Sequence, residues 1–134
     1  MELGLDTYSY HLAFGRHPDR KRDGPMTLAK CLNRVRKLGF SVVQVDPLHF
    51  NPEKDRSAWV NRMAGSLGIK LLASGMSVEP ETLKRDIDLA SEWGTTVLRT
   101  YLGSSYAGTR HGADKKTLAR AAKTISESVK HAEE

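Results

Sequence analysis

Hydrophobic positions follow two alternating patterns along the chain. Where apolar residues recur every three or four positions they mark one face of a helix, and short apolar runs rich in β-branched residues predict strands. The expected helices cover 27–39, 52–67, 80–93 and 114–133, and the expected strands cover 2–9, 41–46, 69–74 and 96–101. The expected buried stripes are Leu28, Leu32, Val35 and Leu38; Val60, Met63 and Leu67; Leu83, Ile87, Ala90 and Trp93; and Leu118, Ala122, Ile125 and Val129.

A glycine closes each of the first three helical stretches, and a strand follows it at once. Gly39, Gly68 and Gly94 are separated by 29 and 26 residues, the spacing of a repeated strand–helix unit. A glycine just past a helix end predicts a left-handed helix stop. Helix starts are expected at Thr27, at Asn51 before Pro52, at Pro80 after Glu79, and at Asp114.

Strands that alternate with helices predict an α/β fold with a parallel sheet covered by helices. The long connections then all follow the carboxyl ends of strands, which is the edge where α/β proteins bind ligands. These connections are 10–26, 47–51, 75–79 and 101–113. A flavodoxin-like open sheet is the main alternative, and the lack of a phosphate loop after the first expected strand argues against it.

Composition narrows the class of protein. With 134 residues, 39% hydrophobic and 28% charged, the chain fits one globular domain and not a coiled-coil array or a disordered protein. No apolar run reaches the length of a membrane span, and the N-terminus has no secretory signal pattern. Cys31 is the single cysteine, so no internal disulfide can form, and we expect a reducing, cytoplasmic location.

The net charge is +5, with basic residues concentrated between 16 and 37. Such an excess favours anionic partners in principle. However, no aromatic residues are interleaved for base stacking, so a solvated loop and outer helix face explain the charge better than nucleic-acid binding does.

The stretch GSSYAGTR (103–110) has the glycine spacing of a phosphate-binding loop. Thr109-Arg110 stands where the Lys-Ser/Thr pair is required, which excludes a Walker loop. A looser anion site with Arg99, Arg110 and His111 stays open beside the plain interpretation of a glycine–serine connection.

Polar residues within the expected strands are the first candidates for chemistry. Gln44 and Asp46 share one strand face, and Arg99 lies near the end of the fourth expected strand. Unpaired polar groups are costly to bury, so these side chains need partners. Arg99 either binds substrate oxygens in two-pronged fashion or forms a structural ion pair with Asp46.

Histidines and tyrosines add to the candidates at the strand ends. His11, His49 and His111 fall in connections that follow strands, without the HxH or HxxxH spacing of a zinc site. His11 and His49 fit as ligands of substrate hydroxyls or as proton carriers, and equally as ordinary loop histidines. The tyrosines expected on the same face are Tyr8, Tyr10, Tyr101 and Tyr106. We select His11, Asp46, His49, Arg99 and Tyr101 as substrate-binding candidates, and we assign no catalytic residue.

Several segments resemble the sugar phosphate isomerase/epimerase family, the xylose isomerase-like TIM barrels. They are LGLDTYSYHLAFG, GFSVVQVDPLHF, LGIKLLASGMSVEPETLKRDIDLASEWGTTVLRTYLG and LARAAKTISESVKHAEE. The resemblance implies the first four βα units of a TIM (β/α)8 barrel, parallel strands with helices outside, in a single partial domain over 1–134. A complete barrel takes about 250 residues, so it implies the N-terminal half.

The resemblance also implies the activity. The full-length enzyme would isomerise or epimerise a sugar, sugar phosphate or polyol with a divalent metal, Mn, Mg, Co or Zn. In most members the metal ligands and paired glutamates follow strands five to eight, so no metal ligand is carried over to this half. The substrate wall is carried over by position, to His11, Asp46, His49 and Arg99.

Two other functions stay open. One is a non-catalytic half-barrel that binds a polyol or an anion and is completed by a second copy, because the first and fourth strands would have unpaired edges. The weaker one is a nucleic-acid enzyme similar to endonuclease IV, whose trinuclear zinc site has no convincing set of ligands in this sequence.

Overall fold

The computed structural model of the chain describes residues 2–16, 19–20, 23–50, 56–101 and 115–133. Its strands form one sheet in the order β1-β2-β3-β4, and each neighbouring pair is parallel. The strands are β1 (Gly4–Asp6), β2 (Val42–Val45), β3 (Lys70–Ser74) and β4 (Leu98–Arg99). The parallel α/β sheet predicted from the sequence is confirmed.

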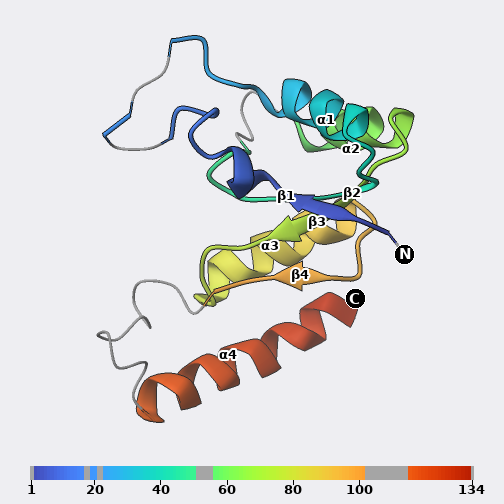
Figure 1. Ribbon diagram of the computed structural model, residues 1–134. Helices are drawn as coiled ribbons and strands as arrows, with labels where there is room; N and C mark the ends of the chain where they lie inside the picture. Colours follow the sequence, from blue (N-terminus) through green and yellow to red (C-terminus); the bar gives the residue numbers. More distant parts are fainter. Residues whose placement is uncertain (1, 17–18, 21–22, 51–55, 102–114, 134) are drawn as a thin grey trace.

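Helices connect the strands and pack against one another in sequence order, α1 on α2, α2 on α3 and α3 on α4. Figure 1 shows α1, α2 and α3 stacked along one side of the sheet, with α4 beyond β4. The helices are α1 (Leu28–Lys37), α2 (Ser57–Ser66), α3 (Pro80–Glu92), α4 (Lys115–Glu133) and a short 3₁₀ helix, η1 (Thr7–Tyr10). Within the described part of the chain, no helix combines the length and apolar character needed to cross a membrane.

The three helix stops predicted from glycine are confirmed, and they share one hydrogen-bond pattern. Gly39, Gly68 and Gly94 all have positive φ. The residue after each glycine donates its N–H to the carbonyl five residues earlier. The N···O distance is 3.2 Å for Phe40, 2.9 Å for Ile69 and 3.0 Å for Thr95. This is the Schellman motif, and it sends the chain from each helix directly toward the sheet.

The core lies between the sheet and helices α1 to α3. Alternate residues of β2 and β3 point into it, and α1 buries one face against them. Its most deeply buried large side chains include Leu28, Leu32, Val35, Val43, Val45 and Val60. Each such side chain contributes about 1.5–3 kcal/mol of transfer free energy. Thr27 caps α1 and Pro80 begins α3, as predicted, whereas Asn51 and Asp114 lie outside the described residues.

Two predictions about the ends of the chain were wrong. The strand predicted over 2–9 ends at Asp6, because the Asp6 carboxylate accepts the N–H of Tyr8 at 2.8 Å and starts η1. On α4, Ala121 and Thr124 are buried, not the predicted stripe, since small residues let the helix approach α3 closely. Large side chains of the predicted stripes that are exposed instead are Leu38, Leu118, Ile125 and Val129.

Candidate functional site

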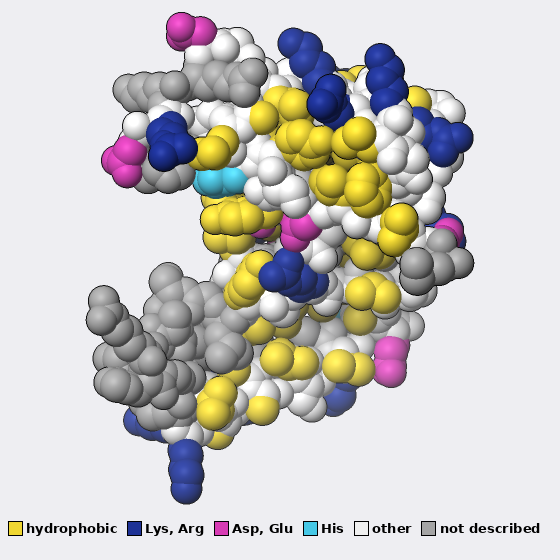
Figure 2. Space-filling model, viewed as in Figure 1, with side chains coloured by type: hydrophobic (Ala, Val, Ile, Leu, Met, Phe, Trp, Pro, Cys, Tyr) yellow, Lys and Arg dark blue, Asp and Glu magenta, His cyan; other side chains and the backbone are white. Residues whose placement is uncertain are grey.

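Three polar side chains from three strands meet at the carboxyl edge of the sheet. Asp6 at the end of β1 lies in register with Gln44 of β2, whose Nε2 donates to the Asp6 Oδ2. Arg99 of β4 donates from Nη1 to the same oxygen at 3.0 Å. Asp6 thus joins the two outer strands across the sheet. Figure 2 shows a basic side chain beside an acidic one near the middle of the view.

The Arg99 guanidinium lies over an aromatic ring. Its Cζ is 4.7 Å from the centre of the Tyr101 ring. With Asp6, Tyr8 and Ser9, these two residues line a hollow of about 270 Å³. The Arg99 side chain is 47% exposed, so its ion pair with Asp6 contributes at most about 1 kcal/mol to stability. The pair mainly orients the guanidinium of Arg99, which is half-exposed and lines the hollow.

A histidine pair lies beside this cluster. His49 Nε2 is 3.0 Å from His11 Nδ1, and His49 Nδ1 is 3.0 Å from the hydroxyl of Thr7. Phe14 stacks on the buried His49 ring and Tyr8 stacks on the His11 ring. Burial lowers the pKa of His49, and nearby His11 and Arg16 act in the same direction, while Asp46 and Asp6 oppose them. His49 is therefore an internal support for His11, which is half-exposed.

Asp46 is buried in the turn that follows β2. Its carboxylate accepts the N–H of Leu48 at 2.9 Å, and its own N–H donates to the Thr7 hydroxyl at 2.9 Å. The structural ion pair considered between Asp46 and Arg99 is wrong, because Arg99 pairs with Asp6. The side chain of Asp46 organises the loop that carries His49.

Asp6 and Thr7 are members of the site that the sequence analysis missed. The strand predicted over 2–9 was too long, so the sequence analysis did not recognise Asp6 as the last residue of β1, in register with Gln44 of β2. An acidic residue followed by Thr at the end of an apolar run was the available signal. Of the five substrate-binding candidates chosen from the sequence, Arg99 contacts Tyr101, and His11 contacts His49.

A bound divalent metal needs several His, Cys, Asp or Glu side chains close together. Within 2–16, 19–20, 23–50, 56–101 and 115–133, no three His, Cys, Asp or Glu side chains gather as metal ligands would. The described residues therefore do not fit a metal. The anion-binding interpretation of 103–110, together with Arg110, His111 and Tyr106, lies outside the described residues.

Comparison with solved structures identifies the architecture. The chain is similar to D-psicose 3-epimerase solved in the presence of D-fructose, with a TM-score of 0.68 and 18% identity over 99% of this chain and 49% of that one. It is also similar to L-ribulose 3-epimerase, with a TM-score of 0.61 and 15% identity over 99% of this chain and 46% of that one. No protein-family model and no curated protein matches the sequence.

The likeness shows the fold, which is half of a TIM barrel, as predicted. The chain spans about half the length of these two epimerases. The order β1-β2-β3-β4 with parallel pairing is the order of consecutive strands in such a barrel. Arg99, Asp6 and Gln44 thus lie at the carboxyl end of the strands, where TIM-barrel enzymes bind their substrates.

Proposed function

We propose that the chain is the substrate-binding half of a sugar isomerase or epimerase, in the cytoplasm. The observation that carries the proposal is the Arg99 guanidinium, fixed by Asp6 at the carboxyl edge of a half-barrel and placed over Tyr101. The fold likeness to two sugar 3-epimerases supports the class of substrate.

The residues of this half act as a wall for the sugar. Arg99 donates hydrogen bonds to a carbonyl or hydroxyl oxygen, and its pairing with Asp6 keeps the guanidinium in one orientation. The rings of Tyr8 and Tyr101 offer apolar faces to the C–H groups of the substrate. His11, supported by His49, donates to or accepts from a further hydroxyl.

The divalent metal implied by the resemblance does not fit the described residues. We place its ligands, and the base that takes the proton beside the carbonyl, in the other half of the barrel. The isolated 134-residue chain should accordingly show no metal-dependent isomerase activity. Turnover of a ketohexose by the chain with added manganese would show that this division of roles is wrong.

Sugar binding tests the assignment of Arg99 directly. A ketohexose titrated into the isotope-labelled chain should shift the amide signals of residues near Arg99 and Tyr101. Arg99→Ala should abolish these shifts, and Arg85→Ala, which removes an exposed arginine on α3, should preserve them. Equal shifts in the two variants would contradict the assignment.

A second function is favoured by the half-exposed guanidinium of Arg99, because its N–H groups can also donate hydrogen bonds to an anion. In that case the chain is a non-catalytic module that binds a polyol or an anion. Inorganic phosphate would then compete with the sugar for Arg99. Stoichiometric binding without turnover after the chain is joined to a complementary half would select this function over the enzyme.

We also propose that the chain on its own self-associates. Strands β1 and β4 are the outer strands of the sheet, and apolar side chains are exposed at Leu3, Val97 and along α4. Figure 2 shows hydrophobic side chains facing outward over α4. Unpaired strand edges of this kind can pair with other copies of the chain.

Light scattering at micromolar concentration should show oligomers, and Val97→Lys should reduce them while the control Leu38→Lys does not. A monodisperse monomer would contradict the proposal.

A further inference from the structure

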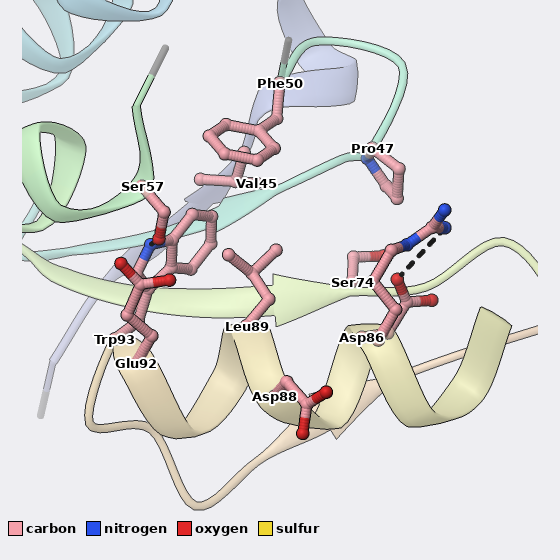
Figure 3. Close-up of a pocket in the computed structure, with 11 residues that line it drawn as sticks. Val45, Pro47, Phe50, Ser57, Ser74, Asp86, Asp88, Leu89, Glu92 and Trp93 are labelled. Atoms are coloured by element: carbon pink, nitrogen blue, oxygen red, sulfur yellow. Dashed lines mark hydrogen bonds and ion pairs between the residues drawn. The ribbon is translucent and has the colours of Figure 1, made fainter. Parts of the chain in front are cut away.

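A second cavity lies between α3 and the segment that follows β2. Its volume is about 500 Å³, which suits one small organic ligand. It shares no lining residue with the hollow around Arg99. Figure 3 shows a polar end, with Ser74 and Asp86, and an apolar end, with Val45, Phe50, Leu89 and Trp93.

The polar end holds hydrogen-bonding groups without partners. Asp86 is 5% exposed, and its Oδ1 lies 3.5 Å from Nη2 of Arg85. In the part of the chain that the structure describes, Asp86 Oδ2 and the buried hydroxyl of Ser74 have no hydrogen-bond partner. Burial raises the pKa of Asp86, although Arg85 opposes the shift. A buried carboxylate with an unpaired oxygen is costly, so the polar end favours a ligand that brings a positive charge to Asp86.

The apolar end is held in a fixed geometry. The Phe50 and Trp93 rings meet edge to face with centres 5.5 Å apart. The indole N–H of Trp93 donates to the Ser57 hydroxyl at 2.8 Å, which fixes the orientation of the ring. A flat apolar group can therefore enter beside Leu89 without rearranging these rings.

The charged side chains that line the cavity favour a ligand with a positive charge. Asp86, Asp88 and Glu92 are acidic, and Arg85 is the basic residue of the lining. Asp88 also contacts His131 of α4, with 2.7 Å between Oδ1 and Nε2. A cation gains from this surplus of carboxylates, and an anion is repelled by it.

We propose that this cavity binds a small aryl-alkyl ammonium ion, with the ammonium on Asp86 and the aromatic group between Phe50, Leu89 and Trp93. The ammonium forms an ion pair with the Asp86 carboxylate at the polar end of the cavity. The site is independent of the sugar wall proposed above and goes beyond that function.

The test uses the full chain and two probes of the same shape. Phenethylammonium should bind saturably at millimolar concentration and shift the indole N–H signal of Trp93, whereas uncharged 2-phenylethanol should bind at least about tenfold more weakly. Asp86→Asn should weaken phenethylammonium binding about tenfold or more, and Glu127→Gln, which removes an exposed carboxylate of α4 that is not part of the lining, should change it little.

Leu89→Trp provides a variant that fills the cavity and leaves Asp86 in place. It should abolish binding while the chain keeps its circular dichroism spectrum. Saturable binding that is lost in Asp86→Asn and Leu89→Trp supports the proposal. Absence of saturable binding, equal affinity for the two probes, or binding that survives Asp86→Asn would overturn it.

Discussion

Gly75 lies directly after β3, and an added methyl group there would make a very short contact with a buried side chain. A Cβ at Gly75 would lie 2.5 Å from Asp86 Oδ2 and 3.0 Å from the Thr100 hydroxyl oxygen. The Gly75 N–H donates to the Arg99 carbonyl at 2.7 Å, which holds the backbone in place. To make room, the buried Asp86 carboxylate must rotate toward the cavity between α3 and the segment after β2 and give up its contact with Arg85. Gly75→Ala therefore forces a packed group to move.

The expected cost is that of overpacking a core. Inserting a methyl group into a filled site raises the free energy of the native state by about 1–3 kcal/mol. For a domain of this size the midpoint of thermal unfolding should fall by roughly 4–10 °C. Urea unfolding should show a lower midpoint with an unchanged m-value, since the native state stays compact.

Gly65→Ala is the matched control. Gly65 lies within α2, and a methyl group added there would meet no heavy atom within 4 Å. Alanine is the better helix former, so this variant should gain about 0.5–1 kcal/mol of stability. In an Asp86→Ala background, Gly75→Ala should lose most of its cost. The reasoning is refuted if Gly75→Ala is as stable as the parent, or if its cost is unchanged when Asp86 is absent.

Two further predictions concern buried titratable groups. Burial raises the pKa of the Cys31 thiol from 9.0 to about 11, so a thiol reagent at pH 8 should label the native chain at least about 100-fold more slowly than the urea-unfolded chain; equal rates would contradict this. Burial lowers the folded-state pKa of His49 below 6.5, so the unfolded chain takes up the proton first. The free energy of unfolding measured in urea should then contain the full contribution of neutral His49 above pH 6.5, and it should decrease as the pH falls below that value. His49→Gln should flatten that dependence, and an unchanged slope would argue against it.

The helices and inner strands could be predicted from the sequence because local chemistry fixes them. The Schellman motifs at Gly39, Gly68 and Gly94 involve only neighbouring residues, and helical periodicity places α1 and α3 to within two residues. The partner of Arg99 could not be predicted, since Asp6 is 93 residues away and the curvature of the sheet brings them together. The buried face of α4 likewise depends on which neighbour the helix meets.

The distribution of hydrogen bonds at the strand ends determines what this half of a barrel can offer a substrate. The carboxylates of Asp6 and Asp46 already accept N–H groups from the chain itself, from Tyr8, Gln44, Arg99 and Leu48. The exposed Arg99 guanidinium, by contrast, retains donors that face the hollow. A surface with committed acceptors and available donors is complementary to carbonyl and hydroxyl oxygens. Under the proposed function, this surface would orient a sugar, and the base that removes a proton from that sugar would approach from the opposite wall of a completed barrel.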